Sequence, residues 1–205
     1  SALTANTTAS ENTAIGIETL ASNTTGGGNT AVGRVALVAN TTANNNTAVG
    51  TVSLYSNTTG ASNAALGAYA LQGNTTASDG TAMGYGALLA NTTGASNTAV
   101  GKDALVNNTT QTGNTGVGWN ALGDASSGLG RNTGCGYEAN GGVTTGAANT
   151  ALGWASGGAT TGNGNVCIGY ITGTGSTTAE NRISIGYNVF GTANNRVVLG
   201  SSSGH

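Results

Sequence analysis

Residues 28–60 read GNTAVGRVALVANTTANNNTAVGTVSLYSNTTG and contain the phrase Asn-Thr-Ala-Val-Gly twice, first at 29–33 and again at 46–50. In both copies a Leu follows four residues after the Gly, and an Asn-Thr-Thr triplet begins seven residues after it. The phrase recurs with substitutions along the whole chain, at a step that stays constant except at three places in the C-terminal part. The glycines that end it, called anchor glycines below, are Gly16, Gly33, Gly50, Gly67, Gly84, Gly101, Gly118, Gly136, Gly153, Gly169, Gly186 and Gly200.

The period of the repeat excludes helices. A unit of about 17 residues is too short for a helical repeat, which needs about 33 residues for two helices and a turn. Gly, Asn and Thr are also poor helix formers. The sequence therefore predicts an all-β parallel β-solenoid (a β-roll or β-helix) with about 17 residues per coil. Coils stacked about 4.8 Å apart would form a rod about 55 Å long.

The regularity of the repeat divides the chain into two parts. Residues 1–122 are expected to form a regular solenoid, and residues 123–205 a less regular continuation that ends with a 14-residue coil. Residues 141–146 and 157–164 are expected to protrude as loops. Loops on a rigid scaffold often carry recognition, so receptor contact is expected there.

Alternation within the phrase predicts which side chains face inward. The apolar residue before each anchor glycine is expected in the core beside the Leu column, giving a core ladder of Val32, Leu37, Val49, Leu54, Val100 and Leu105. The small residue one position earlier, such as Ala31, is expected to permit close approach of a partner chain. A core built from so few apolar side chains in each coil is thin, and a thin core favours oligomerisation.

Two asparagine columns accompany the phrase. The column of Asn12, Asn29, Asn46, Asn63, Asn97 and Asn114 is expected to form ladders of hydrogen-bonded side-chain amides. The Asn of each Asn-Thr-Thr triplet matches the glycosylation signal, but such matches are expected in so repetitive a chain, and we interpret this Asn as structural.

Most aromatic residues fall in one column, directly after the anchor glycine. They could form a structural stack or a strip that binds glycans, and the candidate glycan-binding residues are Tyr85, Trp119, Tyr137, Trp154, Tyr170 and Tyr187.

Composition excludes several classes of function. Only 6% of residues are charged and the net charge is −2, with five scattered basic residues, so no nucleic-acid partner is expected. No apolar run approaches the roughly 18 residues that a transmembrane helix needs, so no membrane insertion is expected. We predict no enzyme activity, no cofactor and no metal site; Asp124 and Glu138 are the nearest candidates for a paired-carboxylate site. Cys135 and Cys167 lie in adjacent columns two coils apart, too far for a disulfide.

The phrase Asn-Thr-Ala-(Val/Ile)-Gly resembles the repeats of trimeric autotransporter adhesin heads. With the final NRISIG and NRVVLG it is still more similar to phage tail-fibre and tailspike shafts. The resemblance implies a homotrimer, attachment to a host cell-surface polysaccharide or other receptor, and a place in the virion tail fibre. In such shafts a chaperone domain is often cleaved off, so His205 could be a processing end; Leu3 and Asn6 fit a unit that begins upstream.

Two other functions remain open. The first is a bacterial trimeric surface adhesin, on the bacterial cell surface. The second is an ice-binding solenoid, because Thr residues stack at Thr13, Thr30, Thr47, Thr81, Thr98 and Thr115; ice binders favour Thr-x-Thr, however, whereas this phrase is Thr-Ala-Val.

Overall fold

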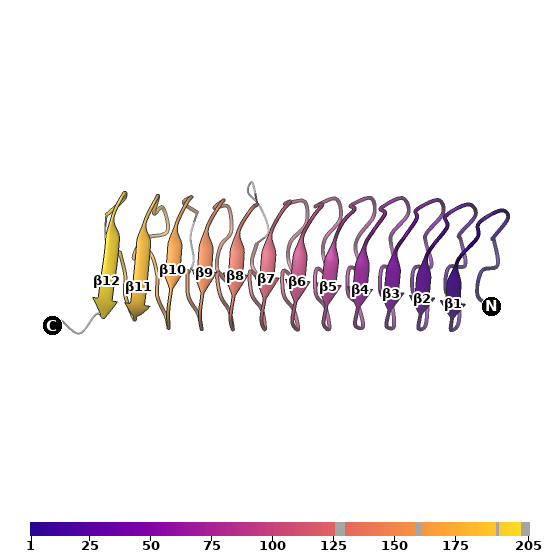
Figure 1. The fold of residues 1–205 in the computed structure, drawn as a ribbon, viewed down its shortest axis with the longest axis horizontal. Helices are drawn as coiled ribbons and strands as arrows, with labels where there is room; N and C mark the ends of the chain where they lie inside the picture. The colour runs from indigo at the N-terminus through magenta and orange to yellow at the C-terminus, as the bar shows by residue number, and fades with distance from the viewer. Residues whose placement is uncertain (126–129, 159–160, 192, 202–205) are drawn as a thin grey trace.

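The computed structural model describes residues 1–125, 130–158, 161–191 and 193–201. The described chain is a stack of coils around one parallel sheet, in which twelve strands lie side by side in sequence order (Figure 1). The strands are β1 (Thr13–Ile15), β2 (Thr30–Val32), β3 (Thr47–Val49), β4 (Ala64–Leu66), β5 (Thr81–Met83), β6 (Thr98–Val100), β7 (Thr115–Val117), β8 (Thr133–Cys135), β9 (Thr150–Leu152), β10 (Val166–Ile168), β11 (Ile183–Tyr187) and β12 (Val197–Ser201).

The predicted parallel β-solenoid is confirmed, together with the predicted period of its coils. Thr30, Ala31 and Val32 pair with Thr47, Ala48 and Val49 of the next coil, so equivalent residues of the repeat lie above one another. The described part of the chain contains no helix. Hydrogen bonds between coils continue outside the strands, as between the Leu37 amide and the Ser53 carbonyl, 3.0 Å apart.

The Leu column fills the interior, as predicted. Leu37, Leu54 and Leu105 are completely buried and belong to one continuous hydrophobic cluster. Each of these residues has a left-handed backbone, with φ of 54°, 48° and 52°. This conformation is unfavourable for a residue other than glycine. Here it turns the Leu side chain inward at a corner of the coil, and burial of that side chain offsets the backbone cost.

The prediction that the apolar residue before each anchor glycine lies in the core is wrong. Ala31 and Ala48 are buried in the core, whereas Val32, Val49 and Val100 are only half-buried and lie on the outer face of the sheet. Space decides this arrangement rather than hydrophobicity. At Gly116, which occupies the Ala column, an added Cβ would already lie 3.2 Å from Cγ of Leu105. A Val side chain would not fit beside Leu, so the small residue faces inward.

The anchor glycines allow the coils to stack closely. Gly67 has φ of +138°, and a Cβ built on it would lie 2.5 Å from the carbonyl oxygen of Gly84 in the next coil. No side chain fits at that distance, and the backbone conformation is itself strained for other residues. This geometry explains why glycine recurs at the end of every phrase.

The amide ladder forms in a different asparagine column from the predicted one. Nδ2 of Asn40 donates to Oδ1 of Asn23, and Nδ2 of Asn57 donates to Oδ1 of Asn40. In the column predicted to form the ladder, Oδ1 of Asn29 instead accepts from the backbone amide of Asn46, 2.9 Å away. The Asn residues of the Asn-Thr-Thr triplets from Asn23 to Asn108 are buried, which agrees with their structural interpretation, whereas Asn6 in the first triplet is exposed.

The interior changes after Leu122. The Leu column continues as Asn140, Gly157, Gly173 and Phe190, and the last three pair as isolated parallel bridges. Residues 141–146 were expected to protrude, but they do not, because Val143 is buried in the core cluster. Of the segment 157–164, residues 159–160 lie outside the described part. In the shorter last coil, β11 and β12 pair over five residues, with Ile183 opposite Val197.

Candidate binding surfaces

A line of outward-facing apolar side chains, some exposed and some half-buried, runs the length of the rod, one position before the anchor glycines. The exposed fraction is 42% at Met83, 46% at Leu66 and 60% at Ile15. We call this line the apolar stripe; its members are Ile15, Val32, Val49, Leu66, Met83, Val100, Val117, Cys135, Leu152, Ile168, Ile185 and Leu199. Because equivalent residues pair from strand to strand, the stripe is continuous across all twelve strands. A continuous exposed apolar surface of this kind is typical of an interaction site.

The aromatic column forms a stacked ladder beside the stripe, from Trp119 to Tyr187. Successive ring centroids lie 4.7, 5.5, 5.0 and 5.2 Å apart, and the interplanar angles are 18° or less. We call these five rings the aromatic ladder: Trp119, Tyr137, Trp154, Tyr170 and Tyr187. Tyr85 stands apart and contacts Tyr69 edge-to-face, with the Lys102 ammonium 6.0 Å from its ring centroid.

The stacking restricts how the ladder could bind a glycan. A pyranose ring stacks on an aromatic face, because its C–H groups meet the negative face of the π system. Tyr137, Trp154 and Tyr170 each have a ladder ring on both faces. They can offer a ligand only their edges. The predicted glycan-binding strip stays a prediction, and within the aromatic ladder it is limited to ring edges and to the outer faces of the two end rings.

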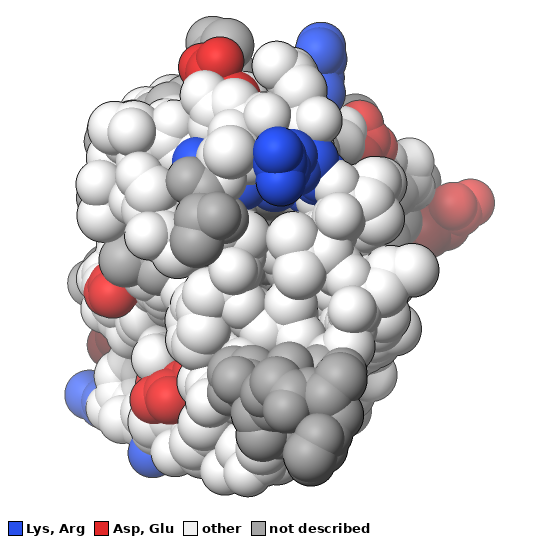
Figure 2. Space-filling model, turned by 90° about the vertical axis from the view of Figure 1, so that its left-hand side faces the viewer, with Lys and Arg blue, Asp and Glu red and all other residues white. Residues whose placement is uncertain are grey.

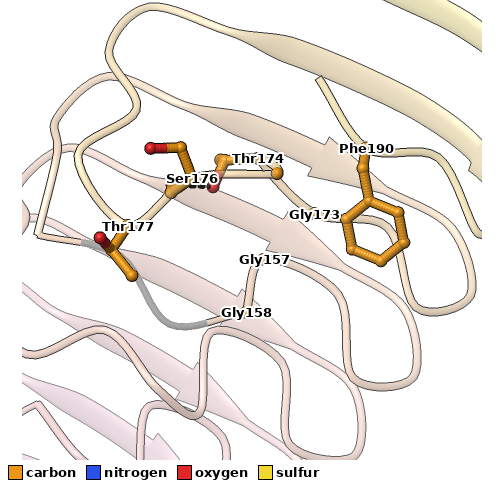
Figure 3. Close-up of a pocket in the computed structure, with 8 residues that line it drawn as sticks. Gly157, Gly158, Gly173, Thr174, Ser176, Thr177 and Phe190 are labelled. Atoms are coloured by element: carbon orange, nitrogen blue, oxygen red, sulfur yellow. Dashed lines mark hydrogen bonds between the residues drawn. The ribbon is translucent and has the colours of Figure 1, made fainter. Parts of the chain in front are cut away.

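A shallow groove lies in the less regular part of the rod. It consists of two cavities of about 250 and 280 Å³ that share Gly158 as a lining residue. In the first cavity the Phe190 ring stands beside Gly173, across from Thr174, Ser176 and Thr177 (Figure 3). Asn120, Asp124 and Glu138 line the second. We call the two cavities together the C-terminal groove.

The two carboxylates singled out in the sequence thus line one cavity. Asp124 is exposed and Glu138 is half-buried. Among the described residues no group of three or more His, Cys, Asp or Glu side chains could hold a metal ion. His205, the predicted processing end, lies outside the described residues.

A buried arginine lies behind the groove. Only 5% of Arg182 is exposed, and its guanidinium donates to the carbonyl oxygens of Thr174 and of Gly191, the latter 2.9 Å away. It also donates to Oδ1 of Asn194 at 2.8 Å. Arg182 takes the place that asparagines hold in most earlier coils: its backbone amide donates to Oδ1 of Asn165. The repeat pattern did not predict this role of Arg182, although an Arg in an Asn column is a visible departure from the repeat.

Cys135 belongs to the apolar stripe, Cys167 belongs to the buried Ala column, and both are free.

On the C-terminal face, charged side chains stand in small separate groups among uncharged residues (Figure 2). In the part of the chain that the structure describes, no helix is long and apolar enough to cross a membrane.

These features define a parallel β-solenoid repeat protein with an outward apolar stripe. No protein-family model, curated protein or solved structure matches the chain.

Proposed function

We propose that the chain is a shaft segment of a homotrimeric fibre of the phage tail-fibre kind, which attaches to a host surface. The observation that carries the proposal is the apolar stripe, which faces outward over the full length of the rod and has no fully buried member. The partner of this stripe is a second and a third copy of the same chain. Copies placed side by side have the same coil spacing, so their stripes can meet rung by rung.

The shape of the coil supports self-association. In the regular coils, up to Leu122, the interior holds one Leu and two small residues, as with Leu54, Ala48 and Ser53, which are all buried. A core this thin contributes little hydrophobic stabilisation to an isolated rod. Packing the stripe against other copies adds the apolar burial that the single coil lacks. The number three comes from the resemblance of the repeats to trimeric fibre proteins.

Charge placed on the stripe tests the proposal. The double variant Val49→Asp, Val100→Asp should dissociate in sedimentation velocity, because each copy would bring two charges into an apolar contact. The matched control is Thr42→Asp, Thr93→Asp, which adds the same charge at exposed residues outside the stripe. Circular dichroism should show β structure in both variants. Unchanged sedimentation of the stripe variant would refute the proposal.

Ice binding remains a second candidate, because Thr47 and Val49 lie on the same outward face of the sheet on either side of buried Ala48. That face would present parallel Thr and aliphatic columns to ice. A thermal-hysteresis measurement separates the two functions: a self-associating shaft hides this face and gives no hysteresis. The bacterial adhesin alternative shares the assembly and differs in the sequence that follows the repeats in the full-length protein.

A further inference from the structure

The C-terminal groove crosses several successive coils. Asp124 lies in the coil that begins at Gly118, and Phe190 lies in the coil that begins at Gly186, four coils further on. At the spacing of parallel strands this distance is about 19 Å. The groove is therefore long enough for an extended ligand of several units. Its lining residues follow the anchor glycine by two to eight positions, so the groove is separate from the apolar stripe.

One end of the groove offers an aromatic surface on a floor of bare backbone. Gly157 and Gly173 occupy the Leu column, and a Cβ at Gly173 would come within 2.8 Å of the Phe190 ring. The ring therefore rests directly on the backbone of the neighbouring coil. It stays 47% exposed, and it is not part of the aromatic ladder whose rings cover one another. Phe190 can thus offer a ring surface that the ladder cannot.

The wall facing Phe190 carries hydroxyl groups (Figure 3). Oγ1 of Thr174 donates to the Ser176 carbonyl oxygen at 2.8 Å, which fixes the turn. The Ser176 and Thr178 hydroxyl oxygens lie 3.4 Å apart, and both residues are exposed, as is Thr177. Exposed hydroxyls at this spacing can donate and accept hydrogen bonds in turn, as sugar hydroxyls require.

Arg182 joins the two walls from beneath. One of its nitrogens donates both to the Thr174 carbonyl, at the start of the hydroxyl wall, and to the Gly191 carbonyl, directly after Phe190. No carboxylate partner of Arg182 is present among the described residues. This buried cation is used to hold the walls together, which marks the first cavity as a pre-organised site.

The other end of the groove determines the charge of the ligand. Asn120 provides an amide, and Asp124 and Glu138 provide carboxylates that accept hydrogen bonds from hydroxyls. No basic residue lines either cavity within the described chain. An acidic ligand would meet like charge there, whereas a neutral polyol would find acceptors.

From this arrangement we infer that the C-terminal groove binds a neutral oligosaccharide of hexose units, with one pyranose ring against Phe190 and the chain extending toward Asp124 and Glu138. The inference deepens the host-attachment part of the proposed function and rests on it for its biological role. It does not depend on the number of copies that assemble.

A glycan array that carries neutral hexose oligosaccharides of two to six units, together with sialylated and uronic-acid oligosaccharides, tests the inference on the intact chain. The chain should bind neutral oligosaccharides and leave the acidic ones unbound. For the best neutral oligosaccharide, Phe190→Ala should weaken the affinity measured by titration calorimetry at least tenfold. Tyr55→Ala, which removes a similarly exposed aromatic ring elsewhere, should leave the affinity unchanged.

The variant Phe190→Leu separates loss of binding from loss of folding, because Leu retains apolar packing against Gly173 but has no aromatic face. Its melting temperature should equal that of the wild type, and its affinity for the oligosaccharide should be weak. Glu138→Gln should reduce affinity with little effect on melting. Absence of neutral-glycan binding, or equal binding by Phe190→Ala, overturns the inference, as does loss of binding on Trp154→Ala alone. A chain that sediments as a single copy and still binds a glycan would refute the proposed assembly but not the proposed glycan site. An assembled chain that binds no glycan would refute the glycan site but not the assembly.

Discussion

Nδ2 of Asn40 lies 2.8 Å from Oδ1 of Asn23, its equivalent one coil earlier, and both side chains are completely buried. The same Nδ2 also donates to the Ala43 carbonyl oxygen at 3.1 Å. Each amide thus joins two coils and closes its own corner. The ladder satisfies polar groups in a thin interior where an unpaired amide would be costly.

Removal of one amide from the ladder should be far more damaging than removal of an exposed amide beside it. Asn108 donates to Oδ1 of Asn91 at 2.8 Å and to the Gln111 carbonyl, and it accepts from Asn114. Asn108→Ala should lower the free energy of unfolding by about 1–3 kcal/mol or more, because buried partners lose their bonds. The neighbouring exposed Asn107 provides the control, and Asn107→Ala should change the free energy of unfolding by less than about 0.5 kcal/mol. Urea denaturation measures both, and equal effects would contradict the role of the ladder.

Serine should be tolerated at one left-handed glycine and rejected at another. Gly67→Ser would drive a Cβ into the Gly84 carbonyl and should prevent folding or lower the melting temperature sharply. At Gly113 (φ +69°) a Cβ would meet nothing closer than 3.6 Å, and the equivalent residue one coil earlier is Ser96 with φ of 56°. Gly113→Ser should cost about 1 kcal/mol or less. Thermal melts that rank the two variants in the opposite order would contradict the stacking of the anchor glycines.

The aromatic ladder should stabilise the less regular coils. Tyr137 stacks on Trp119 at 4.7 Å and on Trp154 at 5.5 Å. Tyr137→Ala removes both ring pairs and should cost about 1–3 kcal/mol. It should also weaken the near-ultraviolet circular dichroism of the two Trp residues. Tyr55→Ala, which lies outside the ladder, should leave that signal intact. A signal unchanged by Tyr137→Ala would show that the rings do not stack in solution.

The buried thiol should make stability depend on alkaline pH. Burial raises the pKa of Cys167 from 9.0 to about 11, against a smaller opposing effect of a backbone hydrogen bond with Gly157. The unfolded thiol ionises first, so the stabilising contribution is complete below about pH 9 and is lost as the pH rises toward 11. Cys167→Ala, which restores the usual residue of this column, should flatten that part of the profile in denaturation curves recorded from pH 8 to 11. An identical profile in both proteins would contradict the burial of this thiol.

The sequence predicted the architecture because a strict period leaves few alternatives. Equivalent residues of successive units must stack, and the Leu column has no exposed place in such a stack. Alternation along Thr-Ala-Val separates two faces but does not say which one points inward. Hydrophobicity favoured Val32 over Ala31 for the interior. Which of the two residues faces inward depends on the space left by the inward Leu side chains. Those Leu residues have a left-handed backbone, which the conformational preferences of Leu would not suggest.

The candidate sites were predicted less well, for a similar reason. The aromatic residues after the anchor glycine could be placed in one column, but the parallel stacking of Trp154 on Tyr137 depends on side-chain angles that the period does not determine. Phe190 continues the Leu column in the sequence, yet its ring is 47% exposed, because its backbone pairs with Gly173 in a bridge and does not have the left-handed conformation of the Leu residues. That difference becomes visible only in three dimensions.

The solution mass of the native chain tests the central claim most directly, since the claim is that the apolar stripe lies between copies. Light scattering coupled to size exclusion, at micromolar concentration and moderate salt, should give three times the 19.6 kDa of one chain. A mass of 19.6 kDa across the concentration range would leave the stripe exposed to water and contradict the account.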